Sequence, residues 1–410
     1  MTRVVVTGMG VATPLGRSVE ELWNNLLNKQ TSITDITDTL PWLSDYKVRI
    51  GSIFKDYNLD IDINPKQVKR MDPFSQFALD AATEAVSDSG FNNSDEIRDR
   101  TGVAIGVGLG GLVEIEKQMT RQIKGGLNKV NPLFIPMGIP DAAAGNVTNY
   151  FGFHATECPA VISACATGAS NIVLGYKNIL LDEADIMVCG GTDSVQTKLT
   201  IAGFGNIGAL STNNDADYAC RPFDRDRSGF IAGEGAGVVV LEKLEHAKAR
   251  GANIYGELIG YGMSADGGDM TAPRKDGKYA TKAMTDAMNR SKIEHVDYIN
   301  THGTSTPLND PIETMAIKRA LGDQAYDVSL NSTKSMIGHT LAASGTIEAI
   351  VSLKTIQTGV IHATRNLENE DPECDLDYTK NNPRERDVRH VLSNSFGFFG
   401  HNVVLAFAKY

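Results

Sequence analysis

Apolar segments that end in glycines alternate along the chain with segments of helical periodicity. Short β-branched runs cover residues 4–7, 103–107, 185–189, 235–241 and 403–407. Such runs are typical of buried strands. Because they alternate with helical segments, the pattern predicts an α/β fold built in layers.

The clearest helical segment covers residues 73–88. Asp72 can cap its N-terminus, Pro73 suits its first turn, and Gly90 can end it. Between these signals, apolar residues recur on one face, at positions 74, 77, 78, 81, 82, 85 and 86. We therefore predict an amphipathic helix that packs on the sheet.

Two stretches in different parts of the chain echo each other. Residues 164–175 and 340–351 both place small residues before an apolar helical run, next to Cys165 and His339 respectively. This echo favours a fold made of two similar halves. We place the boundary after Arg250, giving an N-terminal half of residues 1–250 and a C-terminal half of residues 251–410.

The charge balance and the cysteines narrow the class of protein. The 410 residues carry a formal net charge of −11 and no basic run, which argues against a nucleic-acid partner. An acidic protein partner would need a local basic patch. The chain shows neither a signal pattern nor a run of about 20 apolar residues, so we expect no membrane association. The odd number of cysteines predicts free thiols and a cytoplasmic location; they are Cys158, Cys165, Cys189, Cys220 and Cys374.

Cys165 is the cysteine with the most promising surroundings. It lies in the segment Ser163-Ala164-Cys165-Ala166-Thr167-Gly168, ahead of an apolar helical run. A thiol at a helix N-terminus is expected to have a lowered pKa, and its own N–H can help to hold an oxyanion. The alternative is a buried structural cysteine, which we assign to the other four.

Two histidines follow strand-like segments. His302 lies in a turn rich in glycine and threonine, and His339 closes the segment Ser332-Thr333-Lys334-Ser335-Met336-Ile337-Gly338-His339. Turns of this kind present an imidazole for chemistry, although each histidine could equally be bonded into a polar turn. Near the C-terminus, residues 393–402 place Gly397 and Gly400 among aromatic residues, which predicts a mobile loop beside an apolar pocket.

Taken together and in this order, these motifs resemble the β-ketoacyl-acyl carrier protein synthases of the thiolase superfamily, and most closely the elongating type II kind. The resemblance covers essentially the whole chain. It includes the segments Val5-Val6-Thr7-Gly8-Met9-Gly10, Ala202-Gly203-Phe204, Arg221-Pro222-Phe223-Asp224, Gly229-Phe230 and Gly233-Glu234-Gly235-Ala236-Gly237. It implies a five-layer αβαβα fold of two similar halves and a homodimer.

The resemblance also implies an activity. Cys165 would accept an acyl chain from the phosphopantetheine of an acyl carrier protein, and decarboxylation of malonyl-carrier protein would supply the attacking carbanion. His302 and His339 would stabilise the enolate oxygen, with Lys334 as an electrostatic support. No tightly bound cofactor is implied. The set Cys-His-His separates this activity from degradative thiolases, which use a second cysteine, and from initiating synthases, which use Cys-His-Asn.

Further roles follow only from the resemblance. The N–H groups of Cys165 and Phe398 would form an oxyanion hole, within a gating loop that includes Gly397 and Phe399. Asp310 and Glu313 would hold the lysine and the loop. The other matched positions are an acyl pocket of Leu109, Phe134 from across the dimer, Phe204 and Phe398, a carrier-protein docking patch of Lys69, Arg70 and Lys129, and a structural monovalent cation site near Asn300, Glu348, Ser393 and Asn394. No other metal is required.

The chain departs from the family pattern at several positions. Phe399 replaces a usual glycine, which predicts a narrower tunnel. Gly208 and Asn128 replace usual basic residues that contact the carrier protein. These changes admit a second hypothesis, a specialised synthase of a polyketide or aryl-polyene pathway with its own carrier protein and a possible heterodimer.

Three other hypotheses remain open at this stage. A non-catalytic partner subunit would usually lack the nucleophile, but Cys165 is present. A nucleotide-binding oxidoreductase is suggested only by the glycines of residues 106–111, whose spacing does not fit a dinucleotide loop. A cysteine hydrolase could use Cys165 and His302, and rapid hydrolysis of a thioester would identify it.

Overall fold

The computed structural model describes residues 2–157 and 159–410. Its strands are β1 (Val4–Ala12), β2 (Thr34–Asp35), β3 (Ile50–Gly51), β4 (Thr101–Val107), β5 (Ile186–Asp193), β6 (Gly235–Lys243), β7 (Gly256–Ala265), β8 (Tyr298–Asn300), β9 (Ser329–Asn331), β10 (Val360–Ile361), β11 (Arg384–Glu385), β12 (His390–Gly397) and β13 (His401–Ala408). Each of the five strand-like runs in the sequence lies in or overlaps one of these strands, namely β1, β4, β5, β6 and β13, so those predictions are confirmed.

The α-helices are α1 (Val19–Leu27), α2 (Pro65–Val68), α3 (Pro73–Ser89), α4 (Asp95–Arg98), α5 (Leu112–Gly125), α6 (Phe134–Gly138), α7 (Ala142–Phe151), α8 (Thr167–Leu180), α9 (Lys198–Asn206), α10 (Leu244–Ala249), α11 (Lys278–Ser291), α12 (Asn309–Leu321), α13 (Lys334–Ile337) and α14 (Ser344–Thr358). Short 3-10 turns include η2 (Leu127–Lys129), η3 (Ala164–Ala166), η5 (Leu341–Ala343) and η6 (Phe398–Gly400). Within the described residues, no helix is long and apolar enough to cross a bilayer.

Helix α3 forms as its sequence predicts. The Asp72 carboxylate accepts the N–H of Phe74 at 3.4 Å, and Gly90 ends the helix in the left-handed conformation with φ of 65°. Its buried face includes Phe74, Phe77 and several alanines. The small side chains let α3 lie directly on β1 and β6.

Among the described residues, the largest sheet has nine strands in the order β4-β5-β6-β1-β7-β13-β12-β8-β9. Its two parts meet only at the pairs Val5–Glu257 and Val6–Gly256 of β1 and β7. On each side of this junction the pattern is the same: two antiparallel pairings are followed by a parallel one. The sheet order is therefore symmetric about the β1–β7 pair except for β9, which adds a further parallel pairing with β8 on the second side only.

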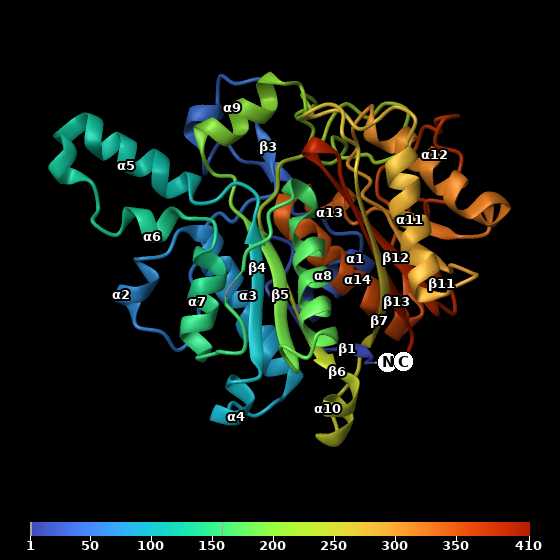
Figure 1. Ribbon diagram of the computed structural model, residues 1–410. Coiled ribbons are helices and arrows are strands. Elements are labelled where there is room, and N and C mark those ends of the chain that lie inside the picture. The colour runs from blue at the N-terminus through green and yellow to red at the C-terminus, as the bar shows by residue number, and fades with distance from the viewer. Residues whose placement is uncertain (1, 158) are drawn as a thin grey trace.

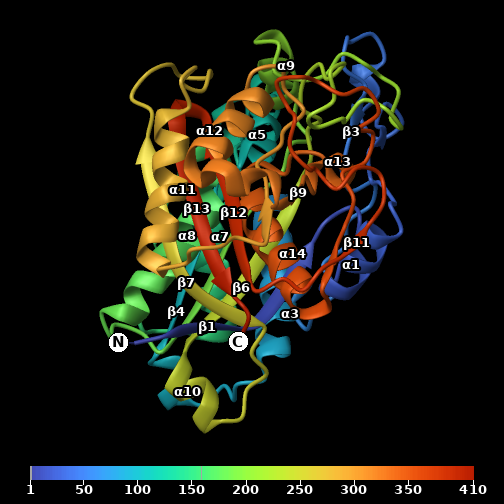
Figure 2. The same cartoon turned by 90° about the vertical axis from the view of Figure 1, so that its right-hand side faces the viewer.

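Helices cover both parts of the sheet and also fill the space between them. Helices α3 and α7 pack on the first part, α11 and α12 cover the second, and α8 and α14 lie side by side in the middle (Figures 1 and 2). This is the layered thiolase-like α/β fold that the sequence predicts. The predicted boundary after Arg250 falls in the connection between α10 and β7, and a division into two independent halves remains a prediction.

The contact between β1 and α3 leaves no room for a side chain at Gly10. A Cβ atom there would overlap the carbonyl oxygen of Ala81 and crowd the amide nitrogen of Ala85, which are both backbone atoms. Neither can move without shifting α3 away from the sheet.

We therefore expect Gly10→Ala to lower the free energy of unfolding by about 1–3 kcal/mol, the usual cost of overpacking. Gly268→Ala is the matched control, because nothing lies within 4 Å of a Cβ at that position, and it should change the free energy by less than about 0.5 kcal/mol. Urea unfolding measures both variants. Equal stability of the two would contradict the close approach of α3.

Candidate active site

Cys165 lies in the turn η3 at the N-terminus of α8, as the sequence predicts. The preceding residue, Ala164, has a φ of 50°, a left-handed conformation that is costly for alanine. This bend presents Cys165 to a cavity of about 320 Å³. The N–H groups of Phe398 and of Cys165 itself point at its sulfur.

Both predicted histidines line the same cavity. The ring centroids of His302 and His339 are 5.4 Å apart and the rings are nearly perpendicular, at 85°. The structure thus brings together three side chains from distant parts of the sequence. The other lining residues are mostly apolar or small and include Phe204, Ile207, Phe230, Leu308, Leu341, Phe396, Gly397 and Phe398.

The hydrogen bonds of His339 determine which ring nitrogen carries its proton. Its Nδ1 accepts the backbone N–H of Leu341 at 3.2 Å and lies 3.0 Å from the Ser344 hydroxyl. Because Nδ1 is an acceptor, the proton of the neutral ring is on Nε2. Burial, followed by the charge of Lys334, holds the pKa of His339 well below its usual value.

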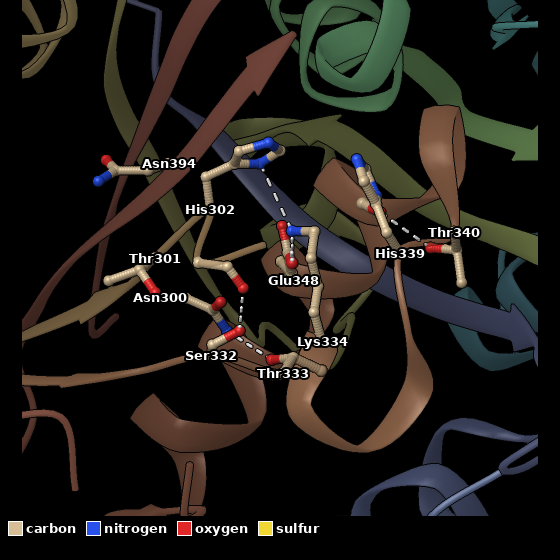
Figure 3. Close-up of polar contacts among 12 residues, drawn as sticks. Asn300, Thr301, His302, Ser332, Thr333, Lys334, His339, Thr340, Glu348 and Asn394 are labelled. Carbon is tan, nitrogen blue, oxygen red and sulfur yellow. Dashed lines mark hydrogen bonds and ion pairs between the residues drawn. The ribbon is translucent and has the colours of Figure 1, made fainter. Parts of the chain in front are cut away.

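For His302, the neighbouring Lys334 determines which ring nitrogen carries the proton. The Lys334 ammonium lies 3.5 Å from His302 Nδ1 and forms an ion pair with Glu348 (Figure 3). An ammonium group can only donate, so Nδ1 of His302 accepts and Nε2 carries the proton. Burial, followed by the charges of Lys334 and His339, holds the pKa of His302 well below its usual value. Burial raises the pKa of Glu348 to about 7, against the opposite effect of Lys334.

Glu313 supports the loop that carries His302, whereas the predicted support of Lys334 comes from elsewhere. The Glu313 carboxylate accepts the N–H groups of His302 and Gly303, both at 2.8 Å. Asp310 accepts the N–H of Phe223 at 2.8 Å. The ion-pair partner of Lys334 is Glu348, so the prediction that Asp310 and Glu313 hold the lysine is wrong.

The predicted lowering of the Cys165 pKa is also wrong. Burial raises the pKa of the thiol to about 12, although Lys334 and the two N–H groups act in the opposite direction. The small, largely apolar cavity removes more hydration from a thiolate than those groups return. The direction of the shift therefore favours the protonated thiol.

The aromatic residues of the gating loop point in opposite directions. The Phe398 ring lies 6.1 Å from that of Phe204 inside the cavity. Phe399 does not line the cavity, and its side chain is 63% exposed. The predicted narrowing of the tunnel by Phe399 is therefore wrong, because its backbone adopts φ of 61° and turns the ring outward.

The remaining predicted residues lie at varying distances from the nucleophile. Leu109 packs in the same apolar cluster as Cys165 and Phe204. Phe134 begins α6, outside the cavity lining of this chain. Lys69 and Arg70 follow α2, and Lys129 ends η2. Of the other cysteines, Cys189, Cys220 and Cys374 are free and buried, whereas Cys158 lies outside the described residues.

One buried group was missed in the sequence. The Asp193 carboxylate accepts the N–H groups of Gly108 at 3.1 Å, Leu109 at 2.9 Å and Ala342 at 2.9 Å, and burial raises its pKa to about 7. It joins β4, β5 and η5 directly behind the site. Its position near the end of a strand, after the paired glycines of residues 190–191, could have identified it, since polar residues at strand ends often contribute to functional sites.

Comparisons with known proteins agree with this geometry. Profiles described as "Beta-ketoacyl synthase, N-terminal domain" and "Beta-ketoacyl synthase, C-terminal domain" match residues 1–247 and 255–368. Proteins named 3-oxoacyl-[acyl-carrier-protein] synthase 2 from Staphylococcus aureus strain N315 and from Synechocystis are 44% and 45% identical, over 100% of this chain and 98% of theirs. A crystal structure of a beta-ketoacyl synthase from Burkholderia phymatum superposes with a TM-score of 0.91 at 33% identity, covering all of both chains. This chain belongs to the β-ketoacyl synthase family.

Proposed function

We propose that this protein is a 3-oxoacyl-acyl carrier protein synthase that elongates fatty acyl chains by decarboxylative condensation. The observation that carries the proposal is the pair of neutral imidazoles, whose Nε2–H groups are free to donate into the cavity that also holds Cys165. Relatives named 3-oxoacyl-[acyl-carrier-protein] synthase 2 match the whole chain at 44% identity, which supports the same activity.

In the first half-reaction, Cys165 would exchange places with the thiol of a carrier-bound acyl thioester. Its sulfur bonds to the acyl carbon, the bond from that carbon to the pantetheine sulfur breaks, and the thiol proton leaves with the pantetheine thiol. The N–H groups of Cys165 and Phe398 would hold the oxyanion of the tetrahedral intermediate. Because one thiol replaces another, no net proton is gained or lost.

In the second half-reaction, a malonyl thioester would lose carbon dioxide and leave an enolate. The Nε2–H groups of His302 and His339 would donate to the enolate oxygen. Its α-carbon then attacks the acyl carbon on Cys165, and the carbon–sulfur bond breaks. The released thiolate takes up one proton, which matches the raised pKa of the Cys165 thiol.

We propose a homodimer whose partner supplies Phe134. Exposed apolar side chains gather on the protrusion formed by α5 and α6; they are Met119, Ile123, Leu127 and Ile135. A monomer rarely leaves such a group in water, and a second copy would cover it.

We also propose that the protein is located in the cytoplasm, because a free nucleophilic thiol suits a reducing compartment.

A specialised pathway has less support than fatty acid elongation. A type II polyketide ketosynthase, in the structure of AntDE bound to the carrier protein AntF, has a TM-score of 0.89 but only 31% identity. The 3-oxoacyl synthase relatives are more similar in sequence. The presence of Cys165 in the cavity also opposes a non-catalytic partner role.

We propose a structural monovalent cation behind Lys334, with one change from the site predicted in the sequence. Within the described residues, the buried side-chain oxygens without a hydrogen-bond partner include Asn300 Oδ1, Ser393 Oγ and Glu348 Oε2, as well as Asn394 Oδ1. Asn300 and Ser393 are paired neighbours on β8 and β12. Three such oxygens suit a monovalent ion, because unpaired buried polar atoms are costly.

Asn394 is left out of this cation site. Successive strand residues point to opposite faces, and its amide donates to Glu313 at 3.0 Å on the outer face of β12. The oxygens that remain belong to the inner face, where Ser395 lies against Gly345 of α14. A cation there would balance the carboxylate oxygen of Glu348 that Lys334 does not reach.

Replacing either histidine should separate the two half-reactions. In His302→Ala or His339→Ala, we expect condensation to fall by about 10²–10³-fold, the usual cost of one oxyanion donor. Transfer of an acyl group to Cys165 should fall much less, since backbone N–H groups serve that step. Mass spectrometry of the acylated chain and release of carbon dioxide measure the two steps, with Cys165→Ala as the blank. Equal losses in both steps would contradict the assignment.

The protonation state of Cys165 can be followed by the pH dependence of its alkylation rate. Because the thiol pKa is raised to about 12, the reactive thiolate fraction should grow about tenfold per pH unit between about pH 7 and pH 9. Alkylation by iodoacetamide, corrected with Cys165→Ala, should follow that slope without a plateau. A rate that levels off below about pH 8 would instead indicate a stabilised thiolate.

The cation site can be tested without measuring activity. Crystals soaked in rubidium chloride should give an anomalous peak bounded by Asn300 Oδ1, Ser393 Oγ and Glu348 Oε2, and the peak should be lost in Ser393→Ala. A peak beside Asn394 Oδ1 instead, or no peak in the wild type, would show that this assignment is mistaken.

A further inference from the structure

Asp193, the last residue of β5, bonds through its two carboxylate oxygens to two segments that border the active site. Its Oδ1 accepts the N–H of Leu109 at 2.9 Å. Its Oδ2 accepts the N–H of Gly108 at 3.1 Å and that of Ala342 at 2.9 Å. The side chain is fully buried. Because an ionised carboxylate only accepts hydrogen bonds, it suits all three donors.

Two glycines allow the carboxylate and the turn η5 to come this close. A Cβ atom at Gly108 would lie 2.7 Å from Asp193 Oδ2, and a Cβ atom at Gly191 would overlap the carbonyl oxygen of Ala342. The first glycine therefore gives the carboxylate room, and the second lets η5 lie directly against β5. The turn is thus held to the sheet by close packing and by a charge-assisted hydrogen bond.

The bond to Ala342 is important because the neighbouring residue orients His339. The N–H of Leu341 donates to His339 Nδ1 at 3.2 Å, which keeps the proton of the neutral ring on Nε2. Leu341 has φ of 50°, a left-handed conformation that persists only where its surroundings hold it. Asp193 supplies part of that support, since it fixes the next residue of the same turn.

The same carboxylate also acts on the nucleophile. Leu109, whose N–H it accepts, packs in one apolar cluster with Cys165 and Leu341. Burial is the largest cause of the raised pKa of Cys165; the negative charge of Asp193 adds to it, whereas Lys334 opposes it. Asp193 therefore influences both the cysteine side and the histidine side of the cavity.

We propose that Asp193 is a positioning residue for condensation, which holds the Leu109 segment beside the nucleophile and the turn that orients His339 in one fixed arrangement. It does not line the cavity, so it acts through the backbone of the two segments and through its charge. This inference rests on the proposed function and deepens it. The geometry of the enolate site would then depend on the segment predicted to border the acyl chain.

The test compares Asp193→Asn with Glu84→Gln. Asparagine has nearly the same shape as aspartate, but its NH2 group must face at least one of the three N–H groups. Glu84 is the matched control, because its half-buried carboxylate also accepts two backbone N–H groups, those of Val11 and Val19, both at 2.8 Å. Burial likewise raises the pKa of Glu84 to about 7, and Glu84 does not line the cavity. Urea unfolding checks that both variants fold.

The kinetic readout separates turnover from binding. In Asp193→Asn we expect the kcat of condensation to fall by about tenfold or more, because a displaced His339 donor misses the enolate oxygen. The KM for the malonyl thioester should change little, since that bond forms only as the enolate appears. Glu84→Gln should retain the wild-type kcat.

Alkylation of Cys165 is a readout that a purely structural role would not move. Asparagine removes a negative charge that disfavours the thiolate, so at about pH 8.5 iodoacetamide should react about threefold to tenfold faster with Asp193→Asn than with the wild type. Glu84→Gln should react at the wild-type rate. Gly108→Ala displaces the carboxylate but keeps its charge, so it should lower kcat without accelerating alkylation; it also serves as the second variant if Asp193→Asn does not fold.

The outcomes distinguish this inference from the proposed function. An unchanged kcat in both Asp193→Asn and Gly108→Ala would overturn the inference alone, and so would equal losses in Asp193→Asn and Glu84→Gln. A wild type that condenses no malonyl thioester would instead refute the proposed function. In that case, the nitrogen-15 NMR shifts of His339, assigned with His339→Ala, would still decide the role of Asp193: the proton should stay on Nε2 in the wild type and be shared between both nitrogens in Asp193→Asn.

Discussion

The buried ammonium group of Lys334 orients His302 and adds its charge to the effect of burial on the whole site. It is paired with Glu348 and lies 3.5 Å from His302 Nδ1, in a region where the effective dielectric is low. Burial lowers the pKa of both histidines, and the charge of Lys334 lowers it further, whereas at Cys165 the same charge opposes the rise in pKa that burial causes. A second cation on either ring is thereby disfavoured, so both imidazoles remain neutral donors.

The two central helices that border the active-site cavity begin in the same way. Helices α8 and α14 both start from a 3-10 turn whose first residue, Ala164 or Leu341, has φ of 50°. The first turn places Cys165 at the start of α8. The second places the Leu341 N–H, which donates to His339 Nδ1, at the start of α14. The nucleophile and the hydrogen bond that orients His339 thus depend on the same structural device, a 3-10 turn that begins with a left-handed residue. A fold built from two similar halves gives two helix N-termini that meet at one cavity.

The sequence was informative about local features and less so about their electrostatics. The strands, α3 with its caps, and the motifs around Cys165, His302 and His339 could be predicted because each depends on residues close together in the chain. The partner of Lys334 could not, since Glu348 is reached only when α14 packs beside α13. The predicted shift of the Cys165 pKa had the wrong direction for the same reason. A helix N-terminus can be identified from neighbouring residues, whereas burial results from contacts with distant segments of the chain.

Phe399 shows where such a chain can vary without loss of chemistry. The loop keeps the left-handed backbone that a glycine would favour, with φ of 61°, at a cost of about 1–2 kcal/mol for a larger residue. Its N–H donates to the carbonyl oxygen of Met270 at 2.7 Å, and Gly400 O accepts the N–H of Asp266 at 2.9 Å. These bonds can hold the strained residue in place, with its ring outside the cavity. Like Asn128, Phe399 lies outside the cavity, whereas Gly208 lines it. The groups that would touch the reacting atoms keep the family pattern.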